Sequence, residues 1–152
     1  MKKKFLHPLL LFLLFSLSSL GQNLADLVEQ NEKAVFLITT SDKYGNPLSQ
    51  GTGFFIHADG TAITNVHVLE NAAKAEIKTT DNKTYSIDMI LDFDNNFDLV
   101  KFKITNPANN KLSAITIAGQ PPKKGEDIFV ISNPKGLENT VSNGIVSSVR
   151  EV

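Results

Sequence analysis

The sequence predicts an all-β fold, a sandwich or a barrel built from short strands. Runs of β-branched and aromatic residues recur at intervals of roughly ten residues, with Gly, Asn, Asp and Pro between them. The chain has 152 residues, 41% of them apolar, and a formal net charge of −1. This composition is typical of a globular protein, and the length allows one domain or two small ones.

The composition also excludes several classes of function. The chain contains no cysteine, which excludes a disulfide framework, a cysteine-ligated zinc site and a thiol nucleophile. The balanced charge argues against nucleic acid as a partner. The histidines and carboxylates show no metal-ligand spacing, and no glycine-rich phosphate loop is present. We therefore expect neither a metal nor a cofactor.

The first 21 residues have the pattern of a secretory signal peptide. Lysines occupy positions 2–4, an apolar run covers residues 5–15, and Ser19 and Gly21 fit the −3 and −1 positions of a cleavage site. The apolar run is too short to span a bilayer as a stable helix, so an uncleaved anchor is the less favoured alternative. The sequence thus predicts a periplasmic or extracellular protein that has no membrane contact after cleavage.

The elements after the signal are expected in the following order. Residues 23–33 should form a short amphipathic helix, because their apolar residues share one face. The β-branched and aromatic stretch 34–40 predicts a strand. Residues 53–57 and 61–64 flank an Asp-Gly turn, which predicts a hairpin with Gly60 at positive φ.

The rest of the chain continues the strand pattern. In residues 99–104, apolar side chains alternate with Lys101 and Lys103, which predicts a half-buried strand. A linker is expected at residues 119–125, where Gly, Pro and Lys gather. The other predicted strands are residues 75–79, 84–91, 112–118, 127–131 and 140–149.

Two residues stand out as candidates for chemistry. His67 follows the predicted strand 61–64, and Asp98 stands between two apolar residues at the start of the strand 99–104. A carboxylate at the mouth of an apolar strand needs a partner. An imidazole is one natural partner, because a carboxylate that accepts the ring N–H fixes the tautomer. His57, beside the Asp-Gly turn, is interpreted as a turn or surface residue, and Asp92 and Asp94 as a solvated loop.

Several segments together resemble the trypsin-like serine proteases, in particular the bacterial HtrA/Deg branch. Each segment is short, but their order and spacing are specific. The similarity extends over residues 34–149. The segments are residues 51–56, Asp59-Gly60, residues 64–68, residues 97–104 and residues 127–147.

The resemblance implies a fold of two six-stranded antiparallel β-barrels with the active site between them. Residues 22–118 would form the complete first barrel, and residues 119–152 part of the second. His67 would be the general base and Asp98 the carboxylate that orients it. Asn65 and Val66 depart from the small residues expected just before the histidine. The implied substrate is a peptide or an unfolded protein, and trimers are common in this branch.

The resemblance also implies a nucleophile that these 152 residues do not contain. It should lie in a Gly-Asn-Ser-Gly-Gly stretch beyond residues 133–136, and no serine of the chain is followed by Gly-Gly. Ser142 is the nearest in local sequence, but its position matches an ordinary strand residue. The oxyanion-hole N–H groups and most of the S1 pocket would be absent with that stretch. We therefore expect no peptidase activity from this chain alone.

Three hypotheses remain at this point. The first is an incomplete copy of a secreted serine endopeptidase, as a truncated gene, a split gene or a partial record. The second is a non-catalytic secreted barrel, a pseudo-protease that binds peptides at a sheet edge. The third is an unrelated β-sandwich with chance matches, which predicts that His67 and Asp98 lie far apart.

Overall fold

The computed structural model describes residues 24–106, 110–133 and 140–150. The predicted signal peptide lies outside these residues. In the described part, no helix is both long enough and apolar enough to cross a membrane. The elements are α1 (Leu24–Glu32), β1 (Val35–Ser41), β2 (Pro47–Phe55), β3 (Thr61–Thr64), α2 (Val66–Leu69), β4 (Lys74–Thr79), β5 (Thr84–Asp94), β6 (Leu99–Ile104), β7 (Asp127–Ser132) and β8 (Thr140–Ile145).

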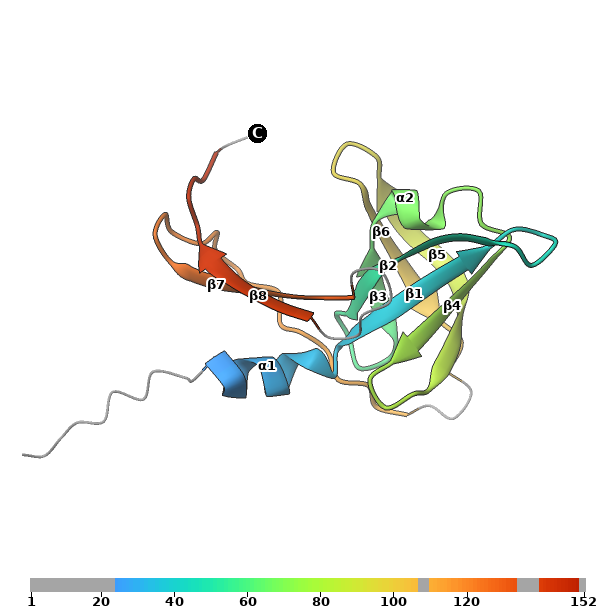
Figure 1. The fold of residues 1–152 in the computed structure, drawn as a ribbon, viewed down its shortest axis with the longest axis horizontal. Coiled ribbons are helices and arrows are strands. Elements are labelled where there is room, and N and C mark those ends of the chain that lie inside the picture. Colours follow the sequence, from blue (N-terminus) through green and yellow to red (C-terminus); the bar gives the residue numbers. More distant parts are fainter. Residues whose placement is uncertain (1–23, 107–109, 134–139, 151–152) are drawn as a thin grey trace, which may run out of the picture.

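Strands β1 to β6 form a closed antiparallel barrel (Figure 1). The order around it is β1-β2-β3-β6-β5-β4, and β4 closes the barrel by pairing with β1, where Ile38 lies opposite Ile77. Closure provides partners for strand edges that an open sheet would leave exposed. The all-β prediction is confirmed, and the fold is a barrel and not a sandwich.

Three phenylalanine rings form the centre of the barrel. Phe36, Phe55 and Phe102 come from β1, β2 and β6, and each is at most 1% exposed. The ring centroids of Phe36 and Phe55 are 4.7 Å apart, and those of Phe36 and Phe102 are 6.4 Å apart. Burying a phenylalanine side chain stabilises a fold by about 1.5–3 kcal/mol, so this cluster is a main source of the barrel's stability.

The backbone of β2 runs against the edge of the Phe36 ring. A Cβ built on Gly53 would lie 2.3 Å from Cε2 and 2.5 Å from Cζ of that ring. Any side chain at position 53 would therefore force Phe36 or β2 to move. Glycine is required here by close approach, since the ring occupies the space of a side chain.

The predicted turn between β2 and β3 is also confirmed. Gly60 has φ +92°, which favours glycine. Oδ1 of Asp59 accepts hydrogen bonds from the backbone N–H and the hydroxyl of Thr61, at 2.9 and 2.8 Å. Lys103 Nζ lies 2.5 Å from Asp59 Oδ2 and lowers the pKa of that carboxyl. The hairpin is thereby tied to β6.

The prediction of a strand at residues 112–118 is wrong, because these residues form no strand in the structure. This stretch attaches to the barrel through two backbone hydrogen bonds, from Leu112 N–H to the Ala58 carbonyl and from Ile115 N–H to the Phe55 carbonyl. The barrel is already closed by six strands, so no edge remains for a full ladder. Strand β8 also ends at Ile145, earlier than the expected residue 149.

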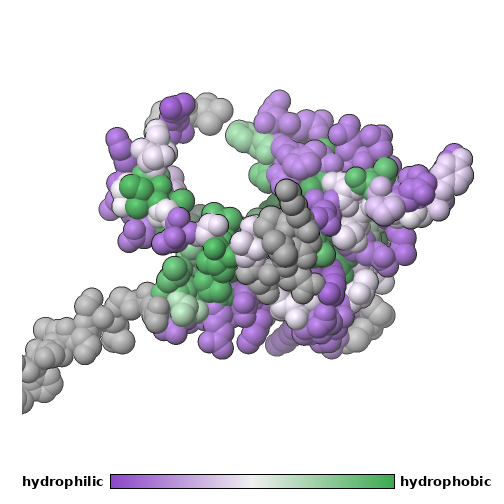
Figure 2. Space-filling view, in the orientation of Figure 1, coloured by the Kyte–Doolittle hydropathy of each residue, from purple (hydrophilic) through white to green (hydrophobic). Residues whose placement is uncertain are grey.

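Strands β7 and β8 form a separate two-stranded sheet at one side of the barrel (Figure 1). Asn133 N–H, just after β7, donates to the Thr52 hydroxyl of β2 at 2.9 Å. Figure 2 shows hydrophobic surface on this sheet. Its exposed apolar residues include Ile128, Val130, Val141 and Ile145.

We expect Gly53→Ala to destabilise the protein by about 1–3 kcal/mol, because the new methyl group meets the Phe36 ring. Urea denaturation of the full chain measures the change. Gly119→Ala is the matched control, since a Cβ there meets nothing within 4 Å. Equal stability of the two variants would contradict the close approach.

Candidate active site

His67 lies on α2, a single helical turn that follows β3. Its neighbour Val68 is 2% exposed and packs on β2. A Cβ at Gly51 would lie 2.6 Å from Val68 Cγ2, so this glycine lets α2 approach the strand closely. With Val68 anchored inward, the His67 side chain is 64% exposed.

Asp98 is the last residue of the turn between β5 and β6. Its φ is +54°, in the left-handed region that few residues other than glycine adopt. Aspartate and asparagine tolerate this conformation better than most, because their short side chains form local hydrogen bonds. Strand β6 begins at the next residue, Leu99, so the turn is held from one side by the barrel.

The structure brings the two candidate residues together. Nδ1 of His67 lies 2.5 Å from Oδ2 of Asp98. The backbone N–H of His67 donates to Oδ1 of the same carboxylate at 3.0 Å. The hypothesis of an unrelated sandwich, which predicted these residues far apart, is therefore wrong.

The electrostatics of the pair favour an ionised carboxylate. The backbone N–H of His67, followed by its ring N–H, lowers the pKa of the Asp98 carboxyl below its usual value. A carboxylate that accepts the Nδ1 proton leaves the lone pair of Nε2 free to accept another proton. General-base chemistry requires an imidazole that is oriented in this way and has its second nitrogen accessible.

The comparison with protein families agrees with this geometry. The model of the trypsin-like peptidase domain matches residues 51–151. The chain belongs to the trypsin-like peptidase family. The matched region includes both residues of the His67–Asp98 pair and the two strands of the separate sheet.

Similar curated proteins belong to the HtrA and Do-like serine proteases. The chain is 33% identical to serine protease HTRA1 of Xenopus laevis over 133 residues, which cover 84% of this chain and 28% of that protein. It is 29% identical to Protease Do-like 1, chloroplastic, of Arabidopsis thaliana over 134 residues, covering 82% and 30%. It is 38% identical to a probable periplasmic serine endoprotease DegP-like of Buchnera aphidicola over 101 residues, covering 65% and 20%. The chain thus spans less than a third of the length of these relatives.

His57, Asp92 and Asp94, the other residues that the sequence singles out, take no part in the hydrogen bonds between His67 and Asp98. His57 belongs to the β2–β3 turn, where its backbone N–H donates to the Thr61 carbonyl at 3.3 Å. Asp94 accepts from two backbone N–H groups of the β5–β6 turn, and Asp92 lies 3.8 Å from Lys101 Nζ. Both aspartates are exposed, but they lie at the end of β5 and pair with Lys101 and Leu99 of β6, so the interpretation of a solvated loop is wrong.

Sequence reasoning missed Asn65. The sequence marks it only as a departure from the resemblance, whereas in the structure its amide Nδ2 donates to the backbone carbonyl of Asp98 at 2.9 Å. An asparagine just before a helical turn suggests an N-cap. The structure shows no side-chain cap at this position, and the amide instead bonds a residue far along the chain.

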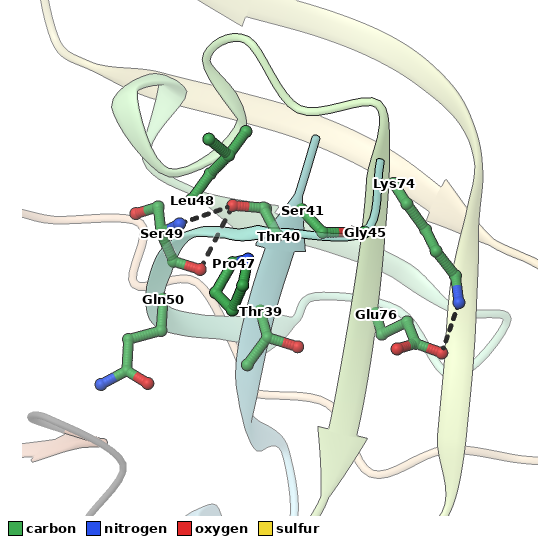
Figure 3. Close-up of a pocket in the computed structure, with 10 residues that line it drawn as sticks. All are labelled: Thr39, Thr40, Ser41, Gly45, Pro47, Leu48, Ser49, Gln50, Lys74 and Glu76. Atoms are coloured by element: carbon green, nitrogen blue, oxygen red, sulfur yellow. Dashed lines mark hydrogen bonds and ion pairs between the residues drawn. The ribbon is translucent and has the colours of Figure 1, made fainter. Parts of the chain in front are cut away.

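A cavity of about 670 Å³ lies on the outside of β1, β2 and β4 (Figure 3). Neither member of the His67–Asp98 pair lines it. An ion pair from Lys74 to Glu76 at 3.1 Å crosses one side, and the Thr40 hydroxyl bonds Ser49 on the other (Figure 3). Among the described residues, no group of three or more His, Cys, Asp or Glu could hold a metal ion.

We expect the stability contributed by the Asp98 carboxylate to depend on pH. Its pKa is lowered in the folded protein, so the contribution is complete above the unfolded pKa and is lost as pH falls through the folded value. The difference in unfolding free energy between wild type and Asp98→Asn should be constant above about pH 5 and shrink below about pH 4. Urea denaturation over a pH series measures it.

Asp88→Asn removes another exposed carboxylate, from β5, and is the control for this series. A wild-type advantage over Asp98→Asn that stays constant down to pH 2, about two units below the ordinary carboxyl pKa, would contradict the lowered pKa.

Proposed function

We propose that this chain carries the general base and the orienting carboxylate of an HtrA-type serine endopeptidase. The observation that carries the proposal is the double contact of His67 with Asp98, through the ring at 2.5 Å and through the backbone N–H at 3.0 Å. The two contacts determine the position of the carboxylate and the ring nitrogen that it meets, Nδ1. Peptides and unfolded proteins are the proposed substrates.

In the proposed reaction, Nε2 of His67 takes the proton of a serine hydroxyl as the oxygen attacks the scissile carbonyl. The same nitrogen then gives the proton to the leaving amine. Asp98 stays ionised and stabilises the imidazolium that forms between these steps. The resemblance assigns the serine and the oxyanion hole to a stretch that these 152 residues do not include, so we propose that this chain alone is inactive.

We also propose a division of the chain into three parts. Residues 1–21 act as a signal peptide that directs the protein to the periplasm or the outside of the cell. The basic and apolar leader supports this, as does the probable periplasmic relative. Residues 22–118 form the first barrel, and residues 119–152 contribute part of a second one. The exposed apolar residues of β7 and β8 favour further strands on that sheet.

The test compares the purified chain with a chimera. The chimera continues beyond Val152 with the segment that follows the matched region in the Buchnera DegP-like relative. We expect the chain alone to leave casein intact and the chimera to hydrolyse it. His67→Ala in the chimera should lower kcat by about 10⁶-fold and Asp98→Asn by about 10⁴-fold.

His57→Ala is the matched control, since His57 is the other described histidine and lies on the β2–β3 turn. It should leave the chimera active. Casein turnover by the chain alone, abolished by His67→Ala, would contradict the proposed inactivity. A folded chimera without activity would favour the peptide-binding barrel instead. Sequencing the source DNA through the codon for Val152 shows whether the frame continues into a Gly-Asn-Ser-Gly-Gly stretch.

A further inference from the structure

Asn65 connects two parts of the site that are distant in sequence. It lies between β3 and α2, and its side-chain amide donates to the Asp98 carbonyl oxygen at 2.9 Å, across 33 residues. The backbone N–H of Val66 donates to the same oxygen at 3.3 Å. The carbonyl of Asp98 is thus held by two donors and its carboxylate by two more from His67.

These four hydrogen bonds differ in whether a side-chain substitution can remove the donor. Two come from backbone N–H groups, of Val66 and His67, which every residue but proline supplies. The third comes from the imidazole itself. The amide of Asn65 is therefore the one donor among them that a side-chain change removes without touching the His67–Asp98 pair.

The conformation of Asp98 explains why the hydrogen bond from Asn65 to its carbonyl matters. Its φ of +54° is a sparsely populated conformation, which persists where the surroundings hold it. If the carbonyl were released, the turn could relax toward negative φ, and the carboxylate would rotate away from the imidazole.

The contact between His67 and Asp98 cannot by itself hold the two side chains in this geometry. The side chains of His67 and Asp98 are 64% and 42% exposed. Exposed ion pairs contribute little, because water screens the attraction and the side chains lose freedom when they meet. The orientation must therefore come from groups that hold the backbone on both sides of the contact.

We propose that Asn65 is a positioning residue, which holds the backbone carbonyl of Asp98 so that the carboxylate meets Nδ1 of His67. The consequence for catalysis rests on the function proposed above, whereas the effect on His67 is a property of the folded chain alone. The anchored carboxylate keeps the neutral imidazole in the tautomer that has its proton on Nδ1. That tautomer leaves Nε2 as the proton acceptor.

The experiment measures this tautomer in the full 152-residue chain. With ¹⁵N-labelled histidine, the ring nitrogen shifts at alkaline pH report the ratio of the Nδ1–H to the Nε2–H form, and His67→Ala assigns the signals. Asn65→Ala should lower the ratio at His67 about fivefold, which is one hydrogen bond of about 1 kcal/mol converted at about 1.36 kcal/mol per decade. In the active chimera, the same variant should lower kcat with little change in KM.

Asn65→Leu is a second variant that keeps the branched shape of the side chain but has no donor, and it should give the same fall. Asn46→Ala is the matched control, since Asn46 also donates its amide to an aspartate, to Asp42 Oδ2 at 2.9 Å in the β1–β2 turn. It should leave the His67 tautomer ratio unchanged. Urea denaturation of each variant shows that the barrel is folded.

Asp98→Asn separates the inference from the proposed function. If it changes the His67 tautomer ratio and both Asn65 variants leave it unchanged, the positioning role is overturned and the function stands. If Asp98→Asn also leaves the ratio unchanged, the pair does not form in solution, and both proposals fall. If both Asn65 variants lose cooperative unfolding, Asn65 is needed for the fold and the positioning role is again overturned.

Discussion

The ring of Phe36 fills the space above Gly53, the residue opposite it on β2, in the core of the barrel. This ring packs on Phe55 and meets the backbone of β2 at Gly53, where no side chain fits. Two residues earlier in β2, Gly51 forms a second close contact, with Val68 of α2. The position of α2, and with it of His67, therefore depends on the same strand that the phenylalanine cluster holds in place. Packing in the core and geometry at the surface are linked through β2.

The His67–Asp98 contact is set by the backbone more than by burial. Both side chains reach solvent, so the water that screens their charges also weakens their attraction. The ion pair of Lys101 with Asp92 across β5 and β6 is also exposed and is longer, at 3.8 Å. At the His67–Asp98 contact, the first residues of α2 direct N–H groups at one aspartate, whose left-handed conformation turns its carboxylate toward them.

The barrel and the β7–β8 sheet differ in how completely their strand edges are paired and their apolar side chains are covered. The barrel closes, and its phenylalanine core is excluded from water. A two-stranded sheet by itself is marginally stable, and this one leaves apolar side chains exposed. One contact with the barrel, from Asn133 N–H to the Thr52 hydroxyl, reaches β2 between Gly51 and Gly53. The sheet therefore meets the barrel on β2, the strand that also positions α2.

The sequence by itself determined the features that depend on neighbouring residues. Alternation in residues 99–104 predicted β6 to the residue, and the Asp59-Gly60 pair predicted the turn with positive φ. The order of short motifs selected His67 and Asp98 as partners, which the structure places in contact.

Only the tertiary structure decided that residues 112–118 form no strand, since the closed barrel leaves no edge for them. Only it revealed that Asn65 bonds the Asp98 carbonyl and that Asp98 is left-handed. The physical reason is the separation along the chain over which each kind of signal acts. Periodicity and turn chemistry act within a few residues, whereas the partner of a strand edge or of an amide 33 residues away is chosen when the barrel closes.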